Sequence, residues 1–337
     1  MEEIKLSFER FAEYEVKNKS PLYYFWCKNI VNTPALLKLS SFIPASQPKP
    51  NLFFAAIYYL TKKHSQHPLA SYLNQPETIN LADSFQALKL FCQDYQLELK
   101  TLFKTKRVQT NEVQRASYLY PIFAEIAAKS LKPLTIIEIG TSAGLLLNLE
   151  HFHYHIEQQP PIQFGQFNSP LKIYAKNLGN PLSTLPPLSI ASRIGIDLSI
   201  VDTQDEEQAL WLECLIWPEL TQRKENLKTA IQLNRHVKSQ LIEGDFRPLL
   251  PLLLKKAQQE NTQIIIFHTH VANQFPPALK EELLHLLQTN SMEQPLYHVY
   301  NNLFDTHLHV DSIYQGEIVS EKILREIDGH GEYYVWR

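Results

Sequence analysis

The first third of the chain has the apolar spacing of helices. From Leu6 to about Ala128, apolar residues recur at intervals of three and four positions, which places them on one face of a helix. Prolines, which lack the backbone donor of the helical ladder, break this pattern at Pro21, Pro34, Pro48, Pro50 and Pro68. The pattern predicts an all-α N-terminal domain over residues 1–130.

The last helix predicted in this domain has the clearest beginning. Asn111 is a candidate N-cap, and Gln114, three positions later, completes a capping box. A single apolar stripe follows, made of Val113, Ala116, Tyr120, Phe123 and Ala127. Pro133 then ends the helical region.

The pattern changes at Leu134, where the nearly all-apolar run Leu-Thr-Ile-Ile-Glu-Ile leads into Gly140. Such runs are typical of strands buried on both faces of a parallel sheet. Strands and helices then alternate: strands over 240–243, 263–267 and 296–303, and helices over 248–259 and 277–288. The alternation predicts an α/β domain over residues 131–337, with a Rossmann-like, doubly wound, mostly parallel sheet.

A long insertion over residues 151–238 separates the first two of these strands. Its proline-rich turns and apolar spacing predict a helix pair, the first helix being capped by Asp205 and Gln208. Arg193 and Asp197 bracket a turn in the insertion, where we expect a structural ion pair. The tail alternates apolar and polar residues, which predicts antiparallel edge strands around Leu308, Val310, Ile313, Tyr334 and Trp336.

Composition and charge narrow the class of protein. The 337 residues include 32 Lys and Arg against 35 Asp and Glu, a net charge of −3, which disfavours a nucleic-acid or anionic-membrane partner. The three cysteines, Cys27, Cys92 and Cys214, form no CxxC pair, so a disulfide scaffold and a cysteine zinc site are excluded. No run approaches the roughly 18 apolar residues of a membrane span. We expect a soluble, cytoplasmic protein, and the sequence predicts no oligomeric state.

The strongest chemical signal is the turn from Glu138 to Gly144, between the strand that begins at Leu134 and a helix predicted over 143–149. Glycine lets a backbone approach a ligand, and a helix N-terminus presents free N–H groups. The turn therefore predicts a site for a phosphate or a nucleoside, although any strand-to-helix turn also favours glycine. The Gly-Lys-Ser/Thr of a P-loop is absent, and Ser142 replaces the middle glycine of the dinucleotide fingerprint.

Glu138, Gly140 and Gly144 resemble the first motif of S-adenosylmethionine-dependent methyltransferases. That resemblance implies that the turn holds S-adenosylmethionine, with cofactor-binding residues Glu138, Gly140, Thr141, Ser142, Ala143 and Gly144. It also implies contacts after the strand 240–243, where Asp245 would accept a hydrogen bond from the adenine amine and Phe246 would pack on the ring. His268 ends the next strand and is the candidate catalytic base. Because parallel strands end at one edge, these residues are expected to share one cleft.

Several separated stretches together resemble one bacterial family, domain of unknown function 2332. They are Pro21-Leu22-Tyr23, Asn51-Leu52-Phe53-Phe54-Ala55-Ala56, Gln109-Thr110-Asn111-Glu112-Val113, Glu138-Ile139-Gly140-Thr141-Ser142-Ala143-Gly144-Leu145, Arg193-Ile194-Gly195-Ile196-Asp197-Leu198, Trp217-Pro218-Glu219, Gly244-Asp245 and Phe267-His268. The resemblance covers nearly the whole chain. It implies a methyltransferase-like Rossmann domain in the C-terminal half and assigns no reaction.

Polar residues in these stretches are candidates for substrate binding. Asn111, Glu112 and Arg115 lie beside the apolar stripe of their helix and are expected to face the α/β half. Arg107 and Arg115 flank the turn and have the chemistry to bind a carboxylate or a phosphate. The alternative is that Thr110, Asn111 and Glu112 only begin a helix.

Histidines offer a second chemistry. The HxH pairs among His151, His153 and His155, at His268 and His270, and at His307 and His309 have the spacing of metal ligands on a strand. No HExxH motif is present, and we place no metal ligand. Three hypotheses remain: a methyltransferase that acts on a small molecule between the helical half and the α/β half, a non-catalytic nucleoside- or metabolite-binding protein, and a metal-dependent hydrolase.

Overall fold

A computed structural model describes residues 1–76, 80–109 and 111–337, and Thr110 of the expected site lies outside them. The chain forms two compact units, Met1–Thr110 with Asp205–Glu225, and Asn111–Gln204 with Asn226–Arg337. Helix α8 (Ala116–Ser130) belongs to the second unit. The division between the units therefore falls about twenty residues before the boundary expected at 130.

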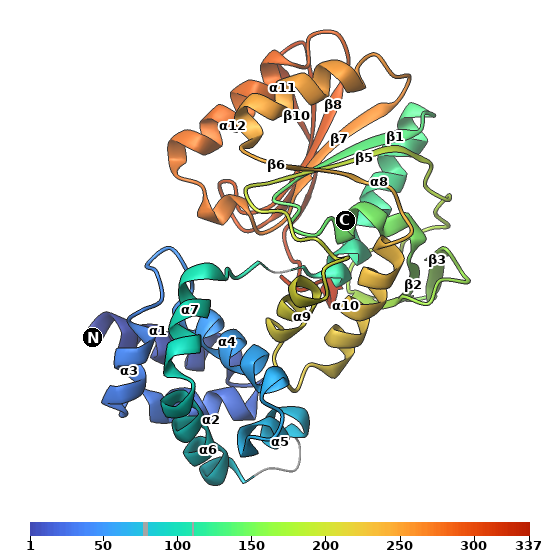
Figure 1. Cartoon of the computed structure of the whole chain (residues 1–337). Helices are drawn as coiled ribbons and strands as arrows, with labels where there is room; N and C mark the ends of the chain where they lie inside the picture. Colours follow the sequence, from blue (N-terminus) through green and yellow to red (C-terminus); the bar gives the residue numbers. More distant parts are fainter. Residues whose placement is uncertain (77–79, 110) are drawn as a thin grey trace. The chain divides into compact units, whose positions relative to one another are not determined.

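The first unit is helical, as its sequence pattern predicts (Figure 1). Pro21, Pro34 and Pro68 each occupy the first turn of a helix, where a missing N–H costs nothing. Aromatic rings fill the core, and Tyr23 stacks on Phe54 with 4.3 Å between ring centroids. The helices are α1 (Glu2–Phe11), a π-helical turn (Ala12–Val16), α2 (Pro21–Ile30), α3 (Pro34–Ser40), α4 (Lys49–Lys63), α5 (Pro68–Asn74), α6 (Leu81–Asp94), α7 (Gln96–Thr105) and α9 (Glu206–Cys214).

A seven-stranded sheet forms the centre of the second unit, in the order β10-β9-β8-β7-β1-β5-β6. Its strands are β1 (Leu134–Ile139), β5 (Ile190–Asp197), β6 (Gln240–Glu243), β7 (Gln263–His268), β8 (Leu296–Tyr300), β9 (Leu308–Tyr314) and β10 (Glu317–Leu324). The five strands β6, β5, β1, β7 and β8 are parallel to one another, whereas β9 is antiparallel to both of its neighbours, β8 and β10. The predicted mostly parallel, Rossmann-like sheet is confirmed.

Helices cover the two faces of this sheet differently. Helices α11 (Phe246–Ala257) and α12 (Pro277–Thr289) pack on one face, where Ile137, Ile139, Ile264 and Ile266 share their hydrophobic core. Helix α8 packs on the other face, with Phe123 and Phe267 in edge-to-face contact at 5.3 Å. Since side chains alternate along a strand, His268 faces α11 and α12, whereas Glu138 faces the side of α8.

The expected insertion contains more than the helix pair. Four strands also lie in it: β5 and the strands β2 (His153–Glu157), β3 (Ile162–Gly165) and β4 (Lys172–Asn177) of a second sheet, whose order is β11-β4-β2-β3. Strands β2, β3 and β4 have four to six residues with exposed positions among them, and β5 is partly exposed in its first half. They therefore lack the continuous apolar run that marks β1. Helices α9 and α10 (Thr221–Asn234) confirm the helix pair, and Asp205 caps α9.

The tail divides between the two sheets. Strands β9 and β10 form the antiparallel edge predicted from Leu308, Val310 and Ile313. The last strand differs in part from the expectation: β11 (Tyr333–Tyr334) pairs parallel with β4 in the smaller sheet, while Tyr334 forms an antiparallel bridge with Ile327. A two-residue strand carries too little pattern to indicate its partner.

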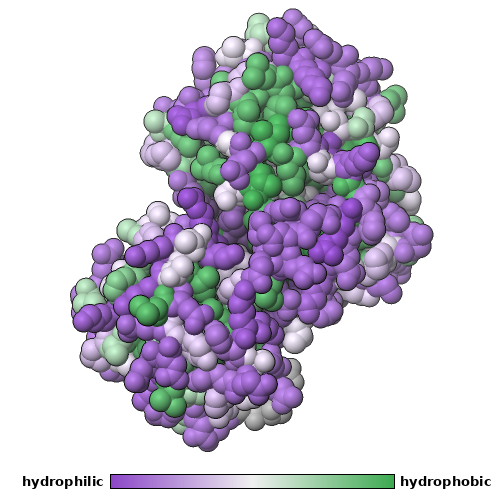
Figure 2. All heavy atoms as spheres, in the orientation of Figure 1, coloured by the Kyte–Doolittle hydropathy of each residue, from purple (hydrophilic) through white to green (hydrophobic). Residues whose placement is uncertain are grey.

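Hydrophobic side chains gather on the surface of the second unit in the region of β6 and α11 (Figure 2). Leu252 of α11 and Leu198 after β5 are largely exposed, and Leu241 and Ile242 of β6 are partly exposed. The β6 edge of the sheet is thus both unpaired and apolar. Among the described residues, no helix has the length and apolar character needed to cross a membrane.

Candidate functional site

The order of the parallel strands places a ligand-binding edge beside β1. From β1 the chain builds outward through β5 and β6, and it then returns to the other side of β1 to form β7 and β8. Open α/β sheets bind ligands at the carboxyl ends of the strands where the order reverses in this way. The turn from Gly140 to Gly144 and the loop after His268 lie at that edge.

The backbone donors of the turn are already used within the chain. The N–H groups of Gly140 and Thr141 donate to the carbonyl of Ile196, and that of Gly144 donates to Thr141. The other two N–H groups donate to side chains, Ser142 to Asp197 at 2.8 Å and Ala143 to Asn111 at 3.3 Å. The turn therefore presents no free set of N–H groups to a phosphate.

The element after the turn is also different from the expected helix over 143–149. It is a 3₁₀ helix over Leu145–His151, with non-helical dihedral angles at Asn148. A short 3₁₀ segment has poorer hydrogen-bond geometry and fewer aligned peptides than an α-helix. An anion site that relies on a helix dipole is not supported here.

Packing within the chain accounts for both glycines of the turn. Gly140 and Gly144 have φ values of +74° and +70°. A Cβ atom at Gly140 would lie 2.4 Å from Cγ2 of Val271, and one at Gly144 would lie 2.7 Å from Cδ2 of Leu241. The glycines admit neighbouring side chains of this chain, not the close approach of a ligand that we expected.

Replacing Gly140 with alanine should destabilise the second unit by about 2–4 kcal/mol, from left-handed backbone strain and overpacking against Val271. Urea denaturation measures this loss. In the double variant Gly140→Ala/Val271→Ala, the shorter side chain at position 271 removes the overpacking. The double variant should therefore be more stable than the sum of the two single effects predicts, with a coupling energy of about 1 kcal/mol or more. If the two substitutions changed the free energy of unfolding in a strictly additive way, the proposed overpacking of residue 140 against Val271 would be contradicted.

Asp197 stands beside the turn, although the sequence pattern assigned it to a structural ion pair. Ile196 is level with Ile139, so the residues that follow, Asp197 and Gly140, leave the sheet side by side. The carboxylate of Asp197 accepts hydrogen bonds from the N–H groups of Ser142, at 2.8 Å, and Ser199, at 3.0 Å. Arg193 pairs instead with Glu150. In dinucleotide-binding sheets an acidic residue on the strand next to the glycine turn contacts the ribose. Asp197 has this position on β5, although it follows the turn by more than fifty residues in the sequence.

Glu138 is buried at the end of β1 and accepts a hydrogen bond from the Thr141 hydroxyl at 2.6 Å. Burial raises the pKa of the Glu138 carboxyl to about 8, and the charge of Asp197 acts in the same direction. The Thr141 hydrogen bond and the charge of Arg115 oppose this shift. In the free protein the carboxyl is therefore largely protonated at neutral pH.

This pKa gives the stability of the protein a definite pH dependence. Between the ordinary pKa of 4.5 and the folded value of about 8, only the folded state holds the proton, so stability falls as pH rises through this window. Glu138→Gln removes the titration and keeps an acceptor for Thr141. The unfolding free energy of the variant relative to the wild type should therefore increase from pH 5 to pH 8, by at most about 1.4 kcal/mol per pH unit. Parallel pH profiles would contradict the assignment.

Asn111 does not cap a helix, contrary to the prediction. Its side chain donates to the Ser142 hydroxyl at 2.8 Å and accepts from the N–H of Ala143. Glu112 is the cap, since its carboxylate accepts the N–H of Gln114 at the start of a 3₁₀ turn over Val113–Arg115 that leads into α8. The side chain of Asn111 is thus held against the glycine turn. Its role in substrate binding stays a prediction.

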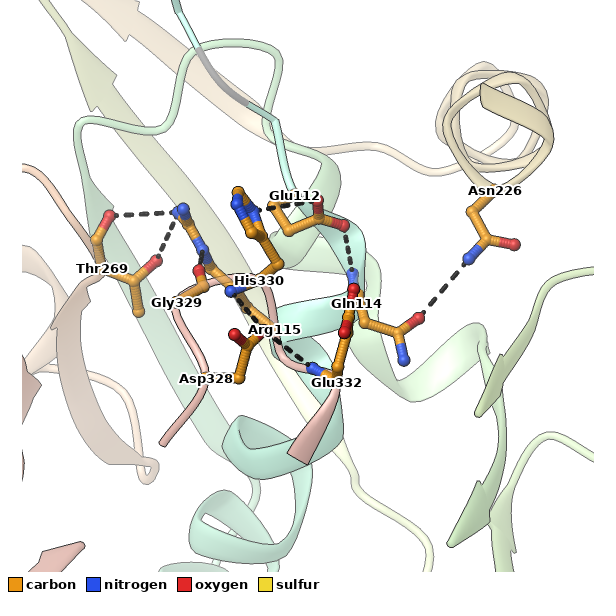
Figure 3. A network of polar contacts seen from close by, with 9 residues as sticks. All are labelled: Glu112, Gln114, Arg115, Asn226, Thr269, Asp328, Gly329, His330 and Glu332. Atoms are coloured by element: carbon orange, nitrogen blue, oxygen red, sulfur yellow. Dashed lines mark hydrogen bonds and ion pairs between the residues drawn. The ribbon is translucent and has the colours of Figure 1, made fainter. Parts of the chain in front are cut away.

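Arg115 and Glu112 contact the C-terminal loop over residues 328–332 (Figure 3). Nε of Arg115 donates to the carbonyl of Gly329 at 2.9 Å, and Nη1 lies 3.4 Å from both oxygen atoms of Thr269. Glu112 lies within ion-pair distance of His330, with 3.6 Å between Oε2 and Nδ1. Asn111, Glu112 and Arg115 therefore contact residues of the α/β unit, but they belong to that unit themselves and do not face it from the helical half.

His268 lies on the other face of the sheet and is fully buried. Its Nε2 is 3.1 Å from Nε2 of His298, and its ring stacks on Tyr300. Burial lowers the pKa of His268 to about 3. A general base needs contact with the substrate and a pKa near the working pH, so this geometry argues against His268 as the base.

The remaining predicted residues are Asp245 and Phe246, which follow β6, and Arg107 of the first unit. Two strands, β1 and β5, separate the ends of β6 and β7, so Asp245 and His268 do not end neighbouring strands. Asp245 caps α11 and pairs with Arg247, while Phe246 packs on Phe275 in the core. Arg107 belongs to the first unit and its side chain is exposed. Ligand contacts by Asp245 and Arg107 stay predictions.

The histidine pairs do not form a metal centre with neighbouring residues. Within residues 1–76, 80–109 and 111–337, no group of three or more His, Cys, Asp and Glu side chains has the arrangement to hold a metal ion. His153 and His155 lie beside each other, with 4.2 Å between ring centroids, and His155 stacks on Tyr174. The metal-dependent hydrolase has no site to support it among the described residues.

Comparison with known proteins identifies the family. The family described as an uncharacterized protein conserved in bacteria (DUF2332) matches residues 5–336. The chain therefore belongs to this family, as the resemblance of its separated stretches indicates. No curated protein and no solved structure matches it.

Proposed function

We propose that the protein is an S-adenosylmethionine-dependent methyltransferase that acts on a small molecule at the carboxyl edge of β1 and β5. The observation that carries the proposal is the position of Asp197, level with Gly140 on the adjacent parallel strand. Nucleoside-binding sheets use a carboxylate at this place to accept hydrogen bonds from ribose hydroxyls. The cofactor would supply an electrophilic methyl group on a sulfonium.

The hydrogen-bonding groups of the edge support a nucleoside over a nucleotide. The N–H groups from Gly140 to Gly144 are used, which leaves a phosphate without backbone donors. The Asp197 carboxylate accepts hydrogen bonds from the N–H groups of Ser142 and Ser199, and the backbone of Leu198 also acts on it. A carboxylate has about four acceptor sites, so capacity remains for a ligand hydroxyl. A ribose diol supplies two donors and complements Asp197. NAD and ATP carry the same diol, but their phosphates would find no backbone donors in this turn, whereas S-adenosylmethionine has no phosphate.

We assign to His330 the uptake of a proton from the acceptor molecule. It is partly exposed, and its Nδ1 lies 3.6 Å from Oε2 of Glu112, which is within ion-pair distance but is not a hydrogen bond. An imidazole whose Nδ1 carries the hydrogen accepts a proton at Nε2. Methyl transfer is mainly a matter of holding two reactants in line, and His330 adds the removal of the acceptor proton where the acceptor is a hydroxyl or an amine.

A non-catalytic ligand-binding protein is the second candidate. The observation that favours it is the cover over the turn: Val271 lies on Gly140 and Leu241 lies on Gly144. These side chains restrict the backbone approach that a tightly held reactive cofactor uses. A methyltransferase converts S-adenosylmethionine to S-adenosylhomocysteine, whereas a non-catalytic protein binds it unchanged, so methyl transfer distinguishes the two functions.

A thermal-shift titration of the purified protein tests the proposal, with S-adenosylmethionine, S-adenosylhomocysteine, NAD and ATP as ligands. Both sulfur nucleosides should stabilise the protein, by about 2.7 kcal/mol at a hundred times the dissociation constant, and NAD and ATP should not. Stabilisation by NAD or ATP alone would refute the proposed ligand class. Stabilisation by the sulfur nucleosides without methyl transfer to any acceptor would favour the binding protein.

A further inference from the structure

Arg115 is a buried cation without an anionic partner. Only 6% of its surface is exposed. Within the described parts of the chain its hydrogen bonds go to neutral oxygen atoms, those of Gly329 and Thr269, and no ion pair involves it. Buried charges in proteins are normally paired, because an unpaired charge in a low-dielectric interior is costly. An anion that reaches Arg115 would supply the missing partner.

Two donors without partners border the loop that Arg115 holds, Thr269–His270. Oδ1 of Asn301 accepts the N–H of His270 at 2.7 Å, which fixes the amide so that Nδ2 is a donor, and this buried Nδ2 has no partner among the described residues. Nδ1 of His270 faces Nδ2 of Asn302 at 3.4 Å. Nδ1 is therefore the acceptor, and Nε2, also without a partner, carries the hydrogen.

The hydroxyl of Tyr118 adds a third group of this kind. It is fully buried, it has no partner among the described residues, and it lies on α8 one turn after Arg115. Buried polar atoms without partners are few in native proteins and call for an explanation, such as a ligand or water. The charge of Arg115 acts on both Tyr118 and His270, and Asn301 is bonded to the backbone of His270. A guanidinium together with N–H and O–H donors complements the oxygen atoms of an anion.

We propose that Arg115, Asn301 and His270 bind the carboxylate of a small organic acid, which is the methyl acceptor of the proposed reaction. Among the described residues of this group Arg115 is the cation, while the acidic side chains of Glu112 and Asp328 act on the same residues. A doubly charged phosphate would meet a net negative surrounding, so the balance favours a monoanion. The identification of the bound acid as the methyl acceptor rests on the proposed function, whereas the carboxylate site does not.

The site is tested by thermal denaturation of the full chain with benzoate or acetate, each against its amide, at constant ionic strength and without S-adenosylmethionine. The carboxylates should raise the unfolding midpoint by about 3–5 °C at ten times their dissociation constant, and the amides should not. A shift with inorganic phosphate at least as large as that with benzoate would overturn the choice of a carboxylate. The absence of a shift with either carboxylate would overturn the site.

Variants connect the response to these residues. Arg115→Met and Asn301→Asp should each abolish the benzoate shift, the latter because it replaces a donor by a negative charge and keeps the acceptor for the N–H of His270. Arg325→Met, an exposed arginine in the same unit, is the control and should keep the full shift. An unchanged shift in a folded Asn301→Asp variant would overturn the proposal. Because no nucleoside is present, the result is independent of whether the cofactor proposal holds.

Discussion

Replacing Asp197 with asparagine is expected to lower the affinity for S-adenosylmethionine by about 100-fold. The carboxylate lies level with the glycine turn, and beside its backbone partners it keeps acceptor capacity for a ribose hydroxyl. Hydrogen bonds to a charged group contribute roughly 1.5–3 kcal/mol each, and 2.7 kcal/mol is about a factor of 100. Isothermal titration calorimetry measures the change.

Asp205→Asn is the matched control for this variant. Asp205 also accepts two backbone N–H groups, at the N-terminus of α9, so the same substitution tests the general cost of losing a capping carboxylate. The control should bind S-adenosylmethionine like the wild type. Equal losses in both variants would show that the effect comes from stability and not from contact with the ligand.

Replacing His330 with glutamine is expected to reduce turnover by about 10²–10⁴-fold, the usual contribution of a general base, with the affinity for S-adenosylmethionine unchanged. The reason is that His330 faces Glu112 across 3.6 Å and not the turn beside Asp197. Glu112→Gln should give a smaller loss, because the imidazole remains while its orientation is less well fixed. Steady-state rates with the natural acceptor measure both effects.

His285 of α12 provides the control, since it is an exposed histidine of the same unit. His285→Gln should leave turnover unchanged. If His330→Gln also left it unchanged, the proton would leave by another route, and the assignment of His330 would be withdrawn without affecting the cofactor site.

The sequence predicts those parts of the fold in which burial is continuous. Strands β1 and β7 are buried at every residue, and the apolar runs that this requires are visible without a structure. Strand β5 is buried only in its second half, so its pattern resembles a loop. The strands of the smaller sheet are short, and in β4 buried and exposed residues alternate. The position of a strand in a sheet is a property of long-range pairing, which a local pattern does not contain.

The sequence predicts the parts of the candidate site that depend on local features, and it does not predict those that depend on strand pairing. The glycine turn and its neighbour Asn111 are local features, and both lie together in the structure. Asp197 could be recognised as a site residue only once β5 was known to pair with β1, although an apolar run that ends in an acid, Ile194 to Asp197, was a visible signal. His268 ends a strand as predicted, but the face to which it points depends on the register of β7 against β1, which the sequence does not reveal.

A crystal structure of the protein with S-adenosylhomocysteine would show directly whether Asp197 binds the ribose. Both ribose hydroxyls should lie within about 3 Å of the Asp197 carboxylate, beside the turn from Gly140 to Gly144. A nucleoside bound elsewhere, or one whose ribose contacts neither Asp197 nor the turn, would contradict the proposed cofactor site.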